Sequence, residues 1–416
     1  MSRKLQPPTF AQIPLLGADN AACSGSAFEL QDAARESEVV ALDGWTVEVL
    51  EGRRIIVVRG GSEENYDHAF CAGLATAQKA LDLMSMRGGN NLVIKATDYD
   101  HLTWWVEAGE VVIRVLSLAP VRIDVPPVTA TVTDSDGIVV PPSPTPAVVW
   151  HESFRYFRLS QTTDDLFDAY RNAYLALESV LSSVAPQLAN SAGKVAEREG
   201  DWFKRALAEA NKILPLAPFA PAGSADPVQD LFDELYVSMR SAMSHAKSGR
   251  KVLLPQDEAE RADVTASLRR LVGLYLKLAE VHLGARRPSG FMFAVAFRKM
   301  VAPTLEHMAM YVSDDESPFD KSEESPNPAG GALKVLSPVG EVDSSGSFIV
   351  TRVWSTPRED LSDLPFVRRV IGMIDDMPAM AAVLEGRLVL GSAKRLEVML
   401  GARGSNTRQP RERYSY

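Results

Sequence analysis

The sequence predicts an α+β multidomain protein with a central four-helix bundle, an N-terminal mixed α+β sheet domain and a small C-terminal α+β segment. Three observations lead to this prediction. Short β-branched segments with alternating polarity fill the region before residue 134. Four amphipathic segments with helical spacing follow between residues 163 and 283. Runs rich in proline, glycine or acidic residues separate these regions.

These changes in composition divide the 416 residues into seven segments, which is enough chain for two or three domains. The predicted segments are a loosely structured N-terminus (1–40), an α+β sheet domain (41–133), a Pro-rich linker (134–150), a helical domain (151–312), an acidic flexible linker (313–331), a small α+β segment (332–400) and a disordered tail (401–416).

Composition narrows the functional classes. No apolar run approaches the roughly 20 residues that span a bilayer, and the first 22 residues lack the apolar core of a signal peptide. The two cysteines, Cys23 and Cys71, suggest neither a disulfide framework nor a structural zinc site. We therefore expect a cytoplasmic protein without a membrane partner. The net charge of −10 argues against broad, non-specific nucleic-acid binding, although a local basic patch is compatible with it.

The sheet domain begins with a predicted hairpin. Its strands are Trp45–Leu50 and Arg53–Arg59, and Glu51-Gly52 forms the turn. A helix over Tyr66–Met84 follows and ends at Gly88-Gly89. Further strands are predicted at Leu92–Ala96, Leu102–Val106, Val111–Leu118, Val121–Val125 and Val128–Thr133. No Lys-Ser/Thr follows either Gly-Gly pair, so we interpret both as turns and expect no nucleotide cofactor there.

Four helices make up the predicted bundle, because each carries an apolar stripe that only another helix can bury. They are Thr163–Val184, Glu199–Leu214, Asp226–Arg250 and Asp263–Leu283. Asp226 is a good N-cap and Pro227 fits the first turn of the third helix. Glu178 lies beside the stripe of the first helix, and we expect it to extend outward to solvent.

The C-terminal region is predicted to contain two strands in Leu333–Val353, a helix over Leu364–Leu384 and a strand at Arg387–Leu390. The preceding Met-rich stretch, Gly290–Met310, is read as strand or irregular structure that turns into helix.

The candidate functional motif is Arg240-Ser241-Ala242-Met243-Ser244-His245, an R-x4-H pattern near the end of the third predicted helix. Cleavage of RNA without a metal needs a base for the 2′-OH, an acid for the leaving 5′-oxygen and a cation over the phosphorane. Histidine can serve as base or acid near neutral pH, and arginine presents a planar, permanently charged fork to phosphate. No metal or other cofactor is then required.

With this motif on a late helix, the region of about Ser160–Leu283 resembles the HEPN superfamily of small helical domains. The resemblance implies a metal-independent endoribonuclease in which Arg240 and His245 are catalytic and Ser241, directly after the arginine, assists. It also implies RNA or a nucleotide as the partner, with Lys247, Arg250 and Lys251 attracting phosphate. The AYRNAYLALESVL run and the HAKSGR element also resemble accessory proteins of methylamine utilisation, which implies a pathway context and no specific chemistry.

Geometry favours a homodimer for this activity. Positions five apart on an α-helix lie about 140° apart around its axis, so Arg240 and His245 share a cleft only if the helix unwinds or two copies meet. Two alternatives stay open. The domain is a non-catalytic module that binds nucleotide, RNA or protein, or the residues are structural, with Arg240 paired to Glu234 or Asp233 and His245 interacting with terminal carbonyls.

Overall fold

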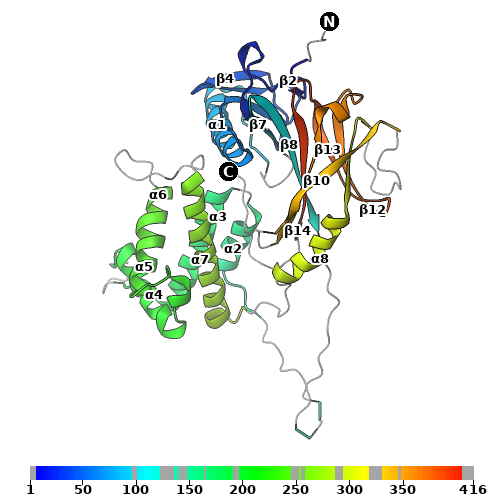
Figure 1. The fold of residues 1–416 in the computed structure, drawn as a ribbon. Coiled ribbons are helices and arrows are strands. Elements are labelled where there is room, and N and C mark those ends of the chain that lie inside the picture. The colour runs from blue at the N-terminus through cyan, green and yellow to red at the C-terminus, as the bar shows by residue number, and fades with distance from the viewer. Residues whose placement is uncertain are drawn as a thin grey trace. The chain divides into compact units, whose positions relative to one another are not determined.

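The structure is a computed structural model, and it describes residues 6–95, 101–121, 135–136, 138–139, 148–163, 165–189, 191, 196–244, 253, 258–285, 294–317, 330–344 and 348–404. The chain divides into two compact units. The sheet unit comprises Met1–Arg122, Met292–Thr407 and Ser415–Tyr416, and the helical unit comprises Ile123–Phe291 and Arg408–Tyr414. The helical unit is thus an insertion in the chain of the sheet unit, as the colours of Figure 1 show.

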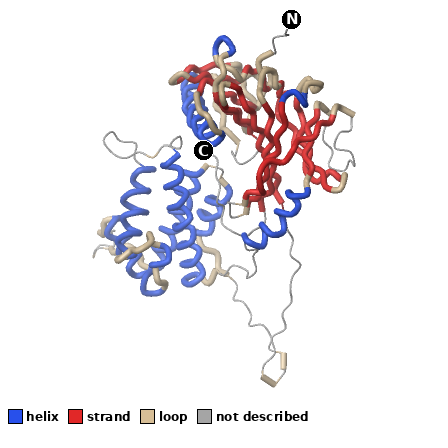
Figure 2. Tube along the Cα trace, in the orientation of Figure 1, coloured by secondary structure: helices blue, strands red, loops and turns tan. Residues whose placement is uncertain are grey.

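Strands from both ends of the chain build the sheet unit (Figure 2). They are β1 (Thr9–Phe10), β2 (Ile13–Pro14), β3 (Ser24–Glu29), β4 (Glu38–Leu42), β5 (Trp45–Val49), β6 (Ile55–Gly61), β7 (His101–Glu107), β8 (Glu110–Val121), β9 (Ala309–Ser313), β10 (Leu333–Asp343), β11 (Ile349–Pro357), β12 (Val367–Ile374), β13 (Met377–Val389) and β14 (Arg395–Gly404). Within the described residues they form one mixed sheet of 14 strands in the order β2-β1-β13-β12-β9-β10-β11-β14-β8-β7-β3-β6-β5-β4.

This sheet contradicts the predicted fold class. The N-terminal α+β region and the C-terminal α+β region are parts of one sheet, and the molecule is not organised around a four-helix bundle core. The physical reason is a pairing that local sequence patterns do not reveal. Strand β14 pairs in parallel with β8, from Arg395 opposite Val112 to Gly404 opposite Val121. Parallel pairing requires a crossover connection, and here Ile123–Phe291 of the helical unit lie within that crossover.

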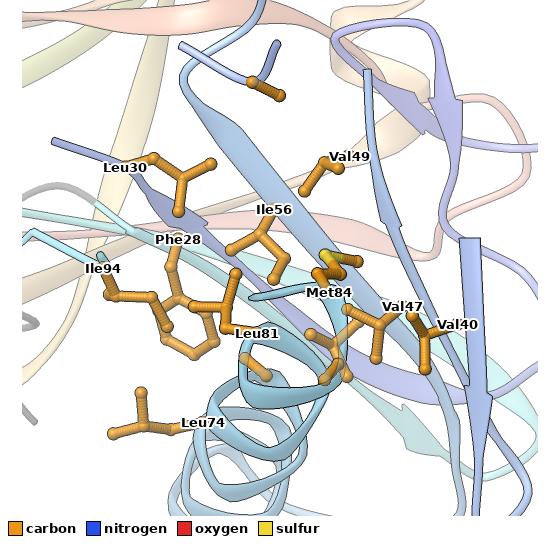
Figure 3. Packing of buried hydrophobic residues seen from close by; sticks show 14 residues of the cluster. Phe28, Leu30, Val40, Val47, Val49, Ile56, Leu74, Leu81, Met84 and Ile94 are labelled. Atoms are coloured by element: carbon orange, nitrogen blue, oxygen red, sulfur yellow. The ribbon is translucent and has the colours of Figure 1, made fainter. Parts of the chain in front are cut away.

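Two helices pack on the sheet. Helix α1 (Tyr66–Arg87) contacts β3, β6 and β7, and α8 (Ala294–His307) contacts β10, β11 and β14 (Figure 1). Figure 3 shows the core under α1, where Leu74, Leu81 and Met84 face Phe28 and Ile56. The prediction of α1 is confirmed, including its end at Gly88, whose φ of 81° is left-handed. The Trp45–Arg59 hairpin is also confirmed as β5 and β6.

The sheet curls so that strands from its two halves approach each other. Phe10 and Leu384 line a cavity of about 160 Å³ together with Phe28 and Ile55. All four side chains are buried, so β1 and β13 approach β3 and β6 at this point.

The predicted helix over Leu364–Leu384 is wrong, because this segment forms the antiparallel pair β12 and β13. Asp375 and Asp376 connect the two strands with φ values of 49° and 61°, as in a two-residue hairpin turn of type I′. The predicted tail begins inside β14, and residues 405–416 lie outside the described part. The predicted strand at Leu92–Ala96 is reduced to a single bridge at Ile94, and of the last two predicted strands, Val121–Val125 and Val128–Thr133, only Val121 is described.

The helical unit contains α2 (Ser153–Thr162), α3 (Leu166–Val184), α4 (Glu199–Ile213), α5 (Pro227–Leu231), the π-helix η3 (Phe232–Arg240), α6 (Ser241–Ser244) and α7 (Glu258–Leu283). Three short 3₁₀ turns complete the described elements: η1 (Ala18–Asn20), η2 (Ala217–Phe219) and η4 (Arg358–Leu361). Helix α2 was not predicted, and it packs along α3. Within the described residues, no helix combines the length and the apolarity needed to cross a bilayer.

Gly25 in β3 provides a test of the packing between strands. A Cβ at this position would overlap the carbonyl oxygen of Val58 and the ring of Trp104. We expect Gly25→Ala to lower the free energy of unfolding by at least about 1 kcal/mol through overpacking. Gly17→Ala is the matched control, because its Cβ would find only ordinary contacts of 3.5 Å or more, and it should stay within about 0.5 kcal/mol of wild type. Urea denaturation measures both, and equal stabilities would contradict the described packing of β3.

Candidate functional site

Arg240 and Ser241 of the predicted motif lie in the helical unit at a junction between two kinds of helix. Arg240 is the last residue of η3, and Ser241 is the first residue of α6. His245, Lys247, Arg250 and Lys251 lie outside the described residues. The site is therefore built from Arg240 and the side chains around it.

The helix that carries Arg240 differs from the regular α-helix that the sequence predicts. Its start is as predicted, since the side chain of Asp226 accepts a hydrogen bond from the backbone N–H of Gln229. From Phe232 to Arg240 it winds as a π-helix. In this turn Met239 is half-buried, and Met243 in the following α6 is buried. Segments of π-helix are rare and often occur at functional sites, which directs attention to this turn.

Arg240 is held by groups from three helices. Its guanidinium forms an ion pair with Glu199, the first residue of α4. Its Cζ lies 4.9 Å from the ring centroid of Tyr236 in η3 and 5.9 Å from that of Tyr174 in α3. The side chain remains 30% exposed, so an edge of the cation faces solvent. This arrangement orients the guanidinium while leaving it accessible to a ligand.

Two carboxyl groups meet beside Arg240. Glu178 of α3 is half-buried and shares a hydrogen bond with Glu199. Burial, followed by the charge of Glu199, raises the pKa of Glu178, and Arg240 opposes this effect only in part. The expectation that Glu178 extends into solvent is thus wrong. A carboxyl with a raised pKa keeps its proton at higher pH than an ordinary glutamate, which is the property of a general acid.

The two tyrosines close the apolar side of the site. Tyr174 stacks on Phe203 with ring centroids 5.5 Å apart, and burial raises the pKa of Tyr174. Its hydroxyl is buried, and no described residue forms a hydrogen bond with it. Tyr236 packs against the first turn of α4 at Gly200, where a Cβ would lie 3.1 Å from the ring. A larger residue than glycine there would displace the tyrosine that supports Arg240.

The structural alternative for Arg240 was an ion pair with Glu234 or Asp233, and this partner is wrong because Arg240 pairs with Glu199. Glu234 is bound to Arg270 of α7, with an oxygen–nitrogen distance of 2.6 Å, and Asp233 accepts a hydrogen bond from Gln229. The reason is helical phase, because the π-turn directs Arg240 toward α3 and α4 and Glu234 toward α7. Sequence reasoning missed Glu199 and Tyr236 as site residues. The only available signal was that Glu199 is an acidic residue in the first turn of its helix. Acidic residues are common there because they interact favourably with the helix dipole, so this signal does not indicate a site.

The chemical capacity of this cluster is clear from its composition. It combines a fixed cation, two carboxyl groups in hydrogen-bond contact, of which Glu178 has a raised pKa, and two phenol groups in a partly desolvated setting. Such a set can bind an oxyanion and transfer a proton to or from it.

Comparison of the chain with protein-family models, with curated proteins and with solved structures found no match.

The raised pKa of Glu178 has a consequence for stability. A carboxyl whose pKa is higher in the folded state than its ordinary value of 4.5 stabilises the fold fully below that value and loses this contribution as pH rises through the raised pKa. We therefore expect Glu178→Gln, which carries no charge at any pH, to gain stability relative to wild type between about pH 4 and pH 7. Chemical denaturation at both pH values, followed by helical circular dichroism, measures the difference.

A matched control is Glu209→Gln on α4, where the carboxylate pairs with Lys212 at 2.7 Å near the surface. Loss of this pair should produce no gain over the same interval. If Glu178→Gln behaves like Glu209→Gln, the raised pKa of Glu178 is contradicted.

Proposed function

We propose that the helical unit is a metal-independent endoribonuclease site centred on Arg240. In this proposal Arg240 stabilises the phosphorane, His245 acts as base or acid, and Ser241 assists in orienting the phosphate. The observation that carries the proposal is the setting of Arg240, which is fixed by Glu199 and Tyr236 and keeps 30% of its side chain exposed. A pre-oriented cation binds a developing oxyanion without a reorganisation cost at the moment of reaction.

The Glu178–Glu199 pair supports the same reaction. An incoming phosphate would replace Glu199 as the partner of Arg240, and two charged carboxylates would oppose its entry. Glu178 with its raised pKa reduces this repulsion when it keeps its proton. It is then also able to donate that proton to the leaving 5′-oxygen, so that Glu178 and His245 form the acid and base of one site.

The proposal includes a homodimer and a cytoplasmic location. On an α-helix Arg240 and His245 would face directions about 140° apart, so a two-fold pair of helical units offers a way to bring a guanidinium and an imidazole into one cleft. Lys247, Arg250 and Lys251 follow directly in the sequence and would add the positive charge that attracts an RNA backbone.

A second candidate is a binding module without catalysis, such as an accessory protein of methylamine utilisation. One observation favours it: the charge of Arg240 is already compensated by Glu199. A compensated arginine beside aromatic rings is suited to stacking with a base or to a protein contact, and it needs no proton transfer.

Incubation of the purified full chain with a mixed pool of labelled RNA in the presence of a metal chelator tests the first candidate. We expect cleavage to products with 2′,3′-cyclic phosphate ends. Arg240→Gln and His245→Ala should each lower the rate by about 100-fold or more, since each removes a group used in the transition state. Arg269→Gln is the matched control, because Arg269 is an exposed arginine of the same unit and should leave the rate unchanged.

Absence of cleavage, or cleavage that His245→Ala does not affect, would overturn the nuclease. Fluorescence anisotropy with the same RNA then separates the candidates. Binding that Arg240→Gln weakens, without any product, identifies the module. Circular dichroism of each variant confirms that the helical unit is folded.

A further inference from the structure

A cavity of about 300 Å³ lies in the sheet unit, and none of its lining residues belongs to the Arg240 site. Its walls come from five separate places: the β1–β2 turn, the β5–β6 turn, the end of β9, β12 and β13. The charged lining consists of Arg53, Arg368, Arg387, Glu316 and Glu385. Three guanidinium groups face two carboxylates there, so one positive charge is in excess.

The cavity exists because the sheet is irregular at this point. Val367 of β12 pairs with Leu388 of β13, but the next pair joins Arg369 to Val383. Residues 384–387 of β13 therefore bulge away from the ladder opposite Arg368. Irregularities of this kind interrupt pairing and redirect side chains, and they recur beside functional sites.

A strained turn covers the bulge. Ala11 and Gln12 connect β1 to β2 with φ values of 49° and 75°, which is unusual for residues other than glycine. The N–H of Ala11 donates a hydrogen bond of 3.1 Å to the carbonyl of Arg387, and a Cβ on Gly386 would overlap Ala11. The close approach of this turn thus depends on glycine at position 386, and it places Gln12 in the cavity wall.

The charge of Arg368 is only partly compensated by its neighbours. Its Nη1 atom is buried, and none of the described residues accepts a hydrogen bond from it. Burial lowers the pKa of Arg368, as expected for a desolvated cation, and Glu385 and Glu316 offset this effect only in part. A buried donor without a partner costs free energy, so its position requires an explanation.

The two neighbouring arginines, Arg387 and Arg369, already have partners. Arg387 binds Glu316 through Nε at 2.8 Å and lies over the ring of Phe366 at 4.6 Å. Arg369 points to the other side of β12, is 1% exposed and donates to the carbonyl of Asp315 at 3.0 Å. Arg369 thereby fixes the loop that carries Glu316. The Nη1 donor of Arg368, and the part of its charge that Glu385 and Glu316 do not offset, remain available to a ligand.

We propose that this cavity, here called the Arg368 pocket, binds a small metabolite through a carboxylate or phosphate group. The planar guanidinium of Arg368 pairs with such an oxyanion, Arg53 at the mouth adds attraction, and Glu385 and Gln12 offer polar contacts to the rest of the molecule. A volume of about 300 Å³ lies at the lower end of the range for ligand sites, which limits the ligand to a small molecule and excludes a nucleic-acid chain.

Isothermal titration of the full chain with inorganic phosphate and with succinate tests this proposal. Saturable binding of either probe is expected, and the tighter probe identifies the group that the natural ligand carries. Arg368→Gln should weaken binding by at least about tenfold, because it removes a charge-assisted hydrogen bond. The matched control Arg54→Gln removes an exposed charge from the adjacent turn and should leave affinity within about twofold.

The thermal stability of the unliganded variants separates a ligand site from a structural arginine. If Arg368 serves a ligand, Arg368→Gln should melt at or above the wild-type temperature, since a desolvated and incompletely compensated charge has been removed. The proposal is overturned if neither probe binds, if Arg54→Gln weakens binding as much as Arg368→Gln, or if Arg368→Gln binds as wild type does.

Discussion

The parallel pairing of β8 with β14 is the constraint on which the sheet unit depends. It joins residues nearly three hundred positions apart. An ion pair fixes its register, because Arg114 and Glu397 lie directly opposite each other with a nitrogen–oxygen distance of 2.6 Å. Both side chains are largely buried, at 17% and 6% exposure. Arg114 also covers the ring of Tyr66 at 4.5 Å, which ties the first turn of α1 to the same point. Removing one partner of such a buried pair typically costs about 3–5 kcal/mol, so a shifted register would be strongly disfavoured.

This pairing also explains how the chain accommodates an inserted unit. The main segment of the helical unit, Ile123–Phe291, begins after β8 and ends before α8, so elements of the sheet unit precede and follow it in the chain. The sheet buries its own core of Phe28, Ile56 and their neighbours without help from the insertion. The two units therefore have separate cores, and each candidate site is composed of residues from one unit only.

Local patterns predicted much of the secondary structure and little of the architecture. The hairpin of β5 and β6 and helices α1, α3 and α4 follow from alternation, periodicity and caps, which are properties of neighbouring residues. The contact between β8 and β14 is non-local and leaves no trace in either strand. Segment β12–β13 was misread because its Ala- and Met-rich second strand has helical propensity, whereas sheet pairing decided its conformation. Of the site, Arg240 was found from a motif, but Glu199 became its partner through the π-turn, which has no known sequence signature here.

Arg240 and Arg368 show how the same side chain acquires different roles from its surroundings. Arg240 is supported by Glu199 and aromatic rings, and it keeps an exposed edge, so its charge is oriented and balanced. Arg368 has a buried nitrogen without a described partner and lies opposite a bulge that prevents the sheet from closing around it. A balanced arginine exchanges one anionic partner for another, and the net gain on binding is the difference between two ion pairs. An arginine whose charge is only partly compensated, as that of Arg368 is by Glu385 and Glu316, gains more from an added anionic partner. For equal ligand chemistry, the Arg368 pocket should therefore bind a small anion more tightly than the Arg240 site, whereas selectivity at Arg240 must come from groups that recognise more than charge.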